Sequence, residues 1–183
     1  MFFSKKVQRY LVGSATIAAV CTPVSAGLET LVAGMSNETS WNARLITLGF
    51  IVAGGGVRYT NGLRRSREQT VGAEATNGDL LRHDARHCAQ FNAITSPFFY
   101  FACGSRSVFE IAVGTSVATV LGYIAGGRLG YLLDTTHDLA GIQPTERIHP
   151  WLNDKSPRAK KAIVALSLVG SAAATALFYY VNK

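Results

Sequence analysis

Residues 109–134 read FEIAVGTSVATVLGYIAGGRLGYLLD, and this stretch decides the fold class of the chain. A small residue stands at every fourth position, at Gly114, Ala118, Gly122, Gly126 and Gly130. In water each glycine costs a helix about 1 kcal/mol relative to alanine. In a bilayer, small residues at this spacing let two helix backbones approach closely. The stretch therefore predicts a transmembrane helix that packs tightly against other helices.

The stripe of small residues turns around its helix, because four residues rotate about 400° on a straight α-helix. Each step of the stripe therefore drifts by about 40°. A stripe that drifts in this way is not expected to face one neighbour over its whole length. We expect it to be divided between helices of the same chain and those of a second copy in a homo-oligomer.

The composition of the chain is uneven along its length. It has 183 residues and a formal charge of +7, with a mean hydropathy of only +0.18. Apolar stretches alternate with segments that hold nearly all of the Lys and Arg. Arginines beside apolar helices indicate membrane orientation and contact with anionic lipid headgroups. No RNA-binding motif or zinc-finger spacing is present, so we expect no nucleic-acid partner.

The apolar stretches predict an all-α fold, a multi-pass transmembrane helical bundle. The expected helices cover residues 11–33, 43–57, 88–103, 108–133 and 162–181, with a polar linker at 139–161. Four of them lie in residues 1–138, and the fifth is an additional C-terminal helix. Residues 58–87 are expected to form a long hydrophilic loop. Basic residues concentrate before the first helix, in this loop and in the linker, which places all three on the inner side of an inner membrane.

The first apolar segment has a second interpretation as a signal peptide. Lys5, Lys6 and Arg9 precede it, and Pro-Val-Ser-Ala at 23–26 resembles a small-residue cleavage site. However, the apolar character resumes after Gly27, and the whole stretch is long enough to span a bilayer. We therefore predict an uncleaved first transmembrane helix.

The motifs of enzymes and metalloproteins are not found in the sequence. The three cysteines form no CxxC pair, so neither a zinc site nor a disulfide framework is indicated. His83 and His87 would share one face of a helix, but no third metal ligand is placed by the sequence. The glycine run at 54–56 lacks the Lys-Ser/Thr of a phosphate loop. We expect no catalytic residues, no metal and no cofactor.

Several polar side chains lie within or beside the expected spans, where an ionisable residue is costly unless it faces protein or water. Glu29, one turn inside the outer end of the first helix, can couple proton movement to export or can stay hydrated at the interface. The candidates for transport or substrate binding are Glu29, Arg44, Asn92, Ser96, Pro97, Arg128 and Asp134.

Two further groups among these candidates admit alternative roles. Arg128 can pair with Asp134, bind a carboxylate ligand, or extend its charge to the membrane surface. Pro97 can leave a backbone carbonyl free for a polar ligand next to Asn92 and Ser96, or it can simply kink the helix.

Three clusters of residues resemble the L-alanine exporter family. The first comprises Glu29, Gly34-Met35-Ser36, Ser40 and Arg44-Leu45; the second is Ser96-Pro97 with Tyr100; the third is Gly126, Gly130-Tyr131, Leu133 and Asp134. Their order and approximate spacing are similar over about residues 10–138. The resemblance implies a small four-helix inner-membrane protein that expels L-alanine by means of the proton gradient.

The chain also departs from the pattern of that family. The family has Tyr-Arg-Asp near the end of the second helix, and Arg58-Tyr59 is only loosely similar to it. The loop that follows is longer than in the family, and this chain has a fifth helix in addition. The added helix supports an alternative hypothesis. In that reading the chain is a non-catalytic, supernumerary subunit of a larger bacterial or mitochondrial membrane complex.

The coupling role of Glu29 is directly testable. Under the exporter hypothesis, Glu29→Gln removes the protonatable group, so proton-driven efflux of L-alanine should be lost while expression and insertion are unchanged. Efflux of labelled L-alanine from inverted or intact vesicles measures the effect. Efflux at the wild-type rate in this variant would rule out the coupling role.

Overall fold

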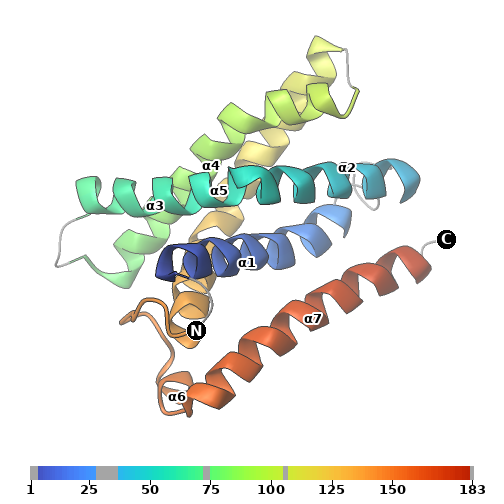
Figure 1. Cartoon of the computed structure of the whole chain (residues 1–183). Coiled ribbons are helices and arrows are strands. Elements are labelled where there is room, and N and C mark those ends of the chain that lie inside the picture. The colour runs from blue at the N-terminus through green and yellow to red at the C-terminus, as the bar shows by residue number, and fades with distance from the viewer. Residues whose placement is uncertain (1–3, 28–36, 72–74, 105–106, 182–183) are drawn as a thin grey trace. The chain divides into compact units, whose positions relative to one another are not determined.

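The computed structural model describes residues 4–27, 37–71, 75–104 and 107–181, which are mostly helical (Figure 1). No strand occurs within those ranges, so the prediction of an all-α fold is confirmed. The chain divides into two compact units. Unit 1 consists of Met1–Val57 with Leu132–Lys183, and unit 2 consists of Arg58–Tyr131.

The helices follow one another with short connections. In chain order they are α1 (Lys5–Gly27), α2 (Asn37–Phe50), the π-helical turn η2 (Ile51–Gly55), α3 (Gly56–Thr70), α4 (Asn77–Ala102), α5 (Val108–Leu139), the short α6 (Pro150–Asn153) and α7 (Pro157–Val181). By length and apolar composition, α1 and α7 are able to cross a membrane. Residues 28–33 of the first expected helix lie outside the described residues.

The prediction of a hydrophilic loop over residues 58–87 is wrong, because α3 continues to Thr70 and α4 begins at Asn77. A capping box starts α4: the Thr76 hydroxyl accepts a hydrogen bond from the Asp79 amide at 3.2 Å, and the Asp79 carboxylate accepts one from the Thr76 amide at 3.1 Å. The hydropathy pattern indicates the apolar part of a helix but not the polar residues that continue the same helix.

Two other expected segments differ in their bounds. The segment at 43–57 is interrupted by η2, where Gly54 has a φ of 118°, a conformation that only glycine adopts without strain. The C-terminal helix begins at Pro157, since proline is well tolerated in the first helical turn, where its missing N–H is not needed.

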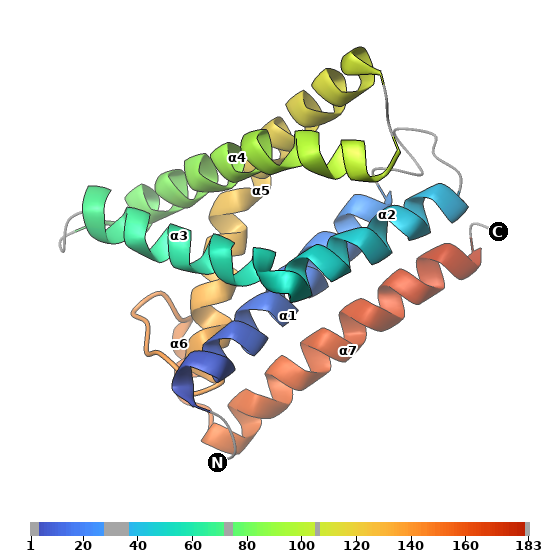
Figure 2. The ribbon, with the colours of Figure 1, turned by 45° about the horizontal axis from the view of Figure 1, so that its top comes forward.

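In unit 1, α1 and α7 lie side by side and run in the same direction (Figures 1 and 2). Midway along, the Ser171 hydroxyl donates a hydrogen bond to the Ala19 carbonyl. Near the end of α7, the Tyr179 hydroxyl lies 2.8 Å from the Ser40 hydroxyl, and its ring packs edge-on against Trp41 at 5.5 Å. The C-terminal helix is therefore attached to both α1 and α2.

In unit 2, α4 packs against both α3 and α5, and it is antiparallel to each. The Tyr59 ring of α3 contacts His87 and Phe91 of α4, with centroid distances of 5.3 and 5.1 Å. On α5, the Ala118 carbonyl accepts a hydrogen bond from the Asn92 amide of α4 at 3.0 Å. Asn92 thus joins two helices of the same unit.

Within the chain, the glycine stripe of α5 faces α4 from Gly114 to Gly130 and is not divided between several helices. Its contact with a second copy stays a prediction. From Gly114 to Gly130, the nearest α4 residues are Tyr100, Asn92, Cys88 and Asp84. The backbones meet closely at Gly126, where an added Cβ would lie 3.0 Å from the Asp84 carbonyl oxygen, and at the adjacent Gly127, where it would lie 2.8 Å from the Leu81 carbonyl oxygen.

The reason is that the contacting residues of α4 also advance in steps of four or eight. These α4 residues therefore form a stripe that turns around α4 just as the glycine stripe turns around α5. Two such rows of residues can stay in contact where two helices cross. Where the helices diverge, long side chains close the gap. A Cβ at Gly114 would lie 2.8 Å from the Tyr100 ring, and the hydroxyl of Tyr100 donates to the Gly114 carbonyl at 3.2 Å.

A pair of alanine substitutions tests this packing. Gly126→Ala should destabilise the protein by about 1–3 kcal/mol, because the new methyl group meets the backbone and Cys88 side chain of α4. Gly49→Ala on α2 is the matched control: nothing lies within 4 Å of its Cβ position, so it should stabilise by up to about 1 kcal/mol. Thermal unfolding in detergent measures both, and equal melting temperatures would contradict the α4–α5 contact.

Candidate functional site: two buried arginine–carboxylate pairs

Unit 2 contains a fully buried carboxylate. Asp84 on α4 has 0% of its surface exposed and receives two hydrogen bonds from the Arg67 guanidinium of α3. Nε donates to Oδ1 at 2.7 Å and Nη2 to Oδ2 at 2.5 Å. The carboxylate lies directly over Gly130 of α5, where any side chain would overlap with it. Residues from all three helices thus define this pair.

Polar side chains extend the pair along the α3–α4 interface. The His83 Nδ1 lies 3.4 Å from Asp84 Oδ1, and its Nε2 lies 2.9 Å from the Ser66 hydroxyl. The rings of His83 and His87 are stacked one helical turn apart, with centroids separated by 6.4 Å. Two imidazoles therefore lie in a row that begins at the buried carboxylate.

Unit 1 contains a second pair, between Asp134 near the end of α5 and Arg147 in the segment that follows it. Arg147 Nη1 donates to Asp134 Oδ2 at 2.6 Å, and the two side chains are 5% and 19% exposed. The connecting segment is held to the same helix end, because the Thr145 amide donates to Asp138 Oδ2 at 2.7 Å.

Hydroxyl groups and an imidazole surround the end of α5 near this pair. Thr16 of α1 donates to the Thr136 hydroxyl at 3.0 Å. Thr135 is buried, and its hydroxyl has no hydrogen-bond partner within the described residues. The Nε2 of His137 lies 3.4 Å from the Arg9 carbonyl oxygen, and burial lowers the pKa of His137 below its usual 6.5.

A buried ion pair of this kind contributes little net stability, because desolvation offsets most of the attraction. Removing one partner is nevertheless destabilising by about 3–5 kcal/mol, since it leaves the other charge uncompensated. Such a pair adds little to stability and is costly to bury, so a role other than stability is worth testing. Both pairs are therefore candidates for function.

The structure distributes the sequence-predicted candidates over both units. Glu29 lies outside the described residues. Arg44 and Asp134 belong to unit 1, where Arg44 is 5% exposed on α2. The remaining candidates, Asn92, Ser96, Pro97 and Arg128, belong to unit 2.

Two proposed roles of these candidates change. Asp134 pairs with Arg147, so the pairing of Arg128 with Asp134 is wrong, and Arg128 is exposed on α5. Pro97 lies inside α4, which continues to Ala102, and the adjacent Ser96 is buried.

The sequence interpretation missed Arg67, Asp84 and Arg147. The first two fell in the residues interpreted as a loop, although the Thr76-x-x-Asp79 capping box was a readable signal that a helix begins there. Arg147 lies in a proline-containing linker, and no local pattern connects it to Asp134. Only the tertiary fold reveals that contact.

Within the described residues, no three His, Cys, Asp or Glu side chains are arranged to hold a metal ion. Comparison of the chain with protein-family models, with curated proteins and with solved structures finds no match. The two ion pairs are therefore interpreted from their geometry.

The buried imidazole of His137 makes stability depend on pH. Because its pKa is lower in the folded state than in the unfolded state, the unfolded chain takes up a proton first as the pH falls below 6.5. Stability should therefore decrease from pH 7.5 to pH values below 6.5, and His137→Gln should make this decrease smaller. Melting temperatures in detergent across this range measure the effect, and an unchanged pH dependence in the variant would contradict it.

Proposed function

We propose that this chain is a multi-pass membrane transporter that exports L-alanine or a similar small amino acid, driven by the proton gradient. The observation that carries this proposal is the Arg67–Asp84 pair, which is buried between α3, α4 and α5. If these helices lie in a membrane, a buried ionisable pair is expected on the ion or substrate pathway.

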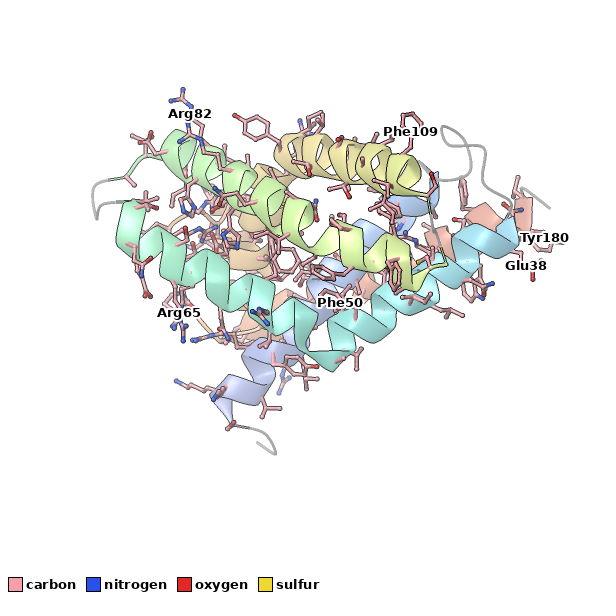
Figure 3. The ribbon with its side chains drawn as sticks, turned by 90° about the horizontal axis from the view of Figure 1, so that it is seen from above. Glu38, Phe50, Arg65, Arg82, Phe109 and Tyr180 are labelled. Atoms are coloured by element: carbon pink, nitrogen blue, oxygen red, sulfur yellow. The ribbon has the colours of Figure 1, made fainter. Side chains whose placement is uncertain are left out.

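The outer surfaces of the helices fit a lipid environment. On α5, Phe109, Val120 and Ile124 are 76%, 59% and 69% exposed, and on α7, Leu166 and Tyr180 are 71% and 72% exposed. Phe109 and Tyr180 project outward from their helices (Figure 3). Exposed apolar patches of this extent are rare in soluble monomers and indicate contact with a membrane or a partner.

Charge also fits insertion with the N-terminus inside an inner membrane. Exposed arginines lie where α3 ends and α4 begins, and Arg65 and Arg82 point away from these helices (Figure 3). Arginines at helix ends favour the cytoplasmic surface and contact anionic headgroups. They would keep this end of the α3–α4 hairpin at the inner surface.

In this proposal, Asp84 is a proton-accepting carboxylate inside the bundle, in addition to the sequence-predicted Glu29. The Arg67 guanidinium donates to both oxygens of this carboxylate. His83, at 3.4 Å from Asp84, and His87 one turn away offer a path for the proton. The candidate Asn92 and the exporter-like Ser96 lie further along the same helix.

A second candidate function is a supernumerary subunit of a larger membrane complex, in the bacterial or the mitochondrial inner membrane. The apolar outer face of α7 favours it, because Leu166, Val169 and Leu177 are all more than 60% exposed and are available for packing against another protein. Co-purification with a large complex at fixed stoichiometry would support this function over a free transporter.

The deciding experiment measures efflux of labelled L-alanine from cells or vesicles with and without the protein. A double variant, Arg67→Met with Asp84→Leu, separates transport from folding. Replacing both members of a buried pair by apolar residues is neutral or stabilises by about 1–4 kcal/mol. We expect this variant to be folded and inserted but unable to transport.

The single variant Asp84→Asn is the control for the loss of one charge of the pair, and it should unfold at a lower temperature than the double variant. Wild-type efflux by the folded double variant would show that the pair has no role in transport. No efflux of any small amino acid by correctly inserted wild-type protein would reject the exporter function and favour the structural subunit.

A further inference from the structure

Exposed arginines from all three long helices of unit 2 lie at one level along the unit. They are Arg64 and Arg65 on α3, Arg82 and Arg86 on α4, and Arg128 on α5, and we call these five residues the arginine belt. Figure 3 shows Arg65 and Arg82 pointing away from opposite sides of the α3–α4 hairpin. The belt therefore lies around the unit and is not a patch on one face.

Contacts between the helices define this common level. Ser66 of α3 lies 2.9 Å from His83 of α4, and Gly130 of α5 lies directly against Asp84 of α4. Each belt residue stands within two positions of one of these four residues. Because a helix rises about 1.5 Å per residue, the five arginines lie within about 6 Å of one another along the helix axes. This is also the level of the buried pair that Asp84 forms with Arg67.

On one side of the belt lie the exposed polar ends of α3 and α4, which carry two carboxylates, Glu68 and Asp79. Glu68 pairs with Arg64 at 3.7 Å, while Asp79 caps α4 and interacts electrostatically with Arg82. Within the described residues, the other three belt residues form no ion pair. The belt therefore keeps a net positive charge.

On the other side of the belt the surface is apolar. Residues 88–102 of α4 and 111–127 of α5 include no charged side chain. Ile94, Phe98 and Ile124 are 67%, 74% and 69% exposed there. The uncharged run of α5 is about 25 Å long, which is close to the hydrocarbon thickness of a bilayer, about 30 Å. The order along unit 2 is thus polar, basic and apolar, as it is across a membrane interface.

We propose that the arginine belt binds anionic phospholipid headgroups and holds the Arg67–Asp84 pair at the headgroup level of the inner membrane surface. This inference rests on the membrane insertion assumed in the proposed function and deepens it. It assigns the lipid partner to five particular residues, and it places the buried pair at the inner end of the proposed proton pathway.

The arrangement of the belt favours a lipid surface over a nucleic acid. A planar layer of phosphates meets arginines that lie at one depth on all sides of a helix unit, and a guanidinium group can donate two parallel hydrogen bonds to a phosphate. A nucleic-acid site instead gathers its basic residues on one face or along one helix. Such a partner would also leave the apolar surface next to the belt uncovered.

The side chain of Arg58 does not contradict this level. Arg58 is exposed on α3 about two turns before Arg65, on the apolar side of the belt. An arginine has a long aliphatic part, which lets the guanidinium extend toward the headgroups while its backbone stays deeper in the membrane.

A fluorophore at a single new cysteine reports the depth of α4. The full-length protein carries Cys21→Ser and Cys103→Ser, and Cys88 is buried. The fluorophore is attached at Gln90→Cys or at Phe98→Cys, and both positions are exposed. They lie about 6 and 18 Å beyond the last belt residue of α4 along the helix.

Quenching by spin-labelled lipids in vesicles then tests the level of the belt. A spin label near the headgroup should quench position 90 at least about twofold more strongly than a label at the chain end, and the reverse should hold at position 98. Stronger quenching of position 90 by the chain-end label, or equal quenching by both labels at both positions, would overturn the proposal.

The same probe at position 90 tests the preference for lipid charge. Spin-labelled phosphatidylglycerol should reach half-maximal quenching at a mole fraction at least about threefold lower than phosphatidylcholine with the same chains. High salt should reduce this preference, because it screens exposed charges. Equal quenching by the two lipids at low salt would overturn the proposal.

Two variants with the same change in net charge locate the preference. The belt variant replaces one arginine on each helix of unit 2, and the control variant replaces three exposed lysines of α1 and α7 in unit 1. They are Arg65→Gln with Arg82→Gln and Arg128→Gln, and Lys5→Gln with Lys6→Gln and Lys161→Gln. The belt variant should lose the preference for phosphatidylglycerol, and the control should keep it.

An unchanged preference in the belt variant, or an equal loss in both variants, would overturn the proposal, since the total charge and not the belt would then set the preference. If the belt variant does not insert, the lipid series and its salt dependence in the wild-type belt decide the question.

These measurements do not depend on transport. The expected quenching without efflux of any small amino acid would retain the belt and reject the exporter function. Efflux of L-alanine by the wild type, with no preference for phosphatidylglycerol, would retain transport and reject the belt. The same lack of preference, together with binding of a short RNA, would indicate a nucleic-acid partner instead.

Discussion

The close approach of α4 and α5 is the constraint on which unit 2 depends. At Gly126 and Gly130 there is no room for a side chain, because the backbone of α4 and the Asp84 carboxylate occupy that space. The absence of side chains on α5 lets Asp84 be completely buried and still reach Arg67 on α3. A larger residue on α5 would therefore disturb both the helix contact and the geometry of the charged pair.

The two arginine–carboxylate pairs differ in their hydrogen bonds and in their neighbours. In unit 2, both oxygens of Asp84 are bonded to one guanidinium and adjoin a row of imidazoles. In unit 1, Arg147 Nη1 donates to Asp134 Oδ2, and the two side chains are 5% and 19% exposed. The two carboxylates are therefore held in different surroundings.

The sequence predicted an all-α fold, because helical periodicity and small-residue spacing are local properties. It indicated Asp134 and the stripe from Gly114 to Gly130 as residues of interest, but it did not identify Arg147 as the partner of Asp134 or α4 as the helix that the stripe faces. Polar helix ends such as residues 58–70 have no apolar signal, so Arg67 and Asp84 were assigned to a loop. The contact between Asp134 and Arg147 depends on how the linker folds back, which no local pattern encodes.

The parallel arrangement of α1 and α7 has a consequence for connectivity. Two helices that run in the same direction and both cross a bilayer start on the same side of it. If both α1 and α7 cross the bilayer, the chain between them must return across it an odd number of times, and the C-terminal ends of the two helices lie at the same surface.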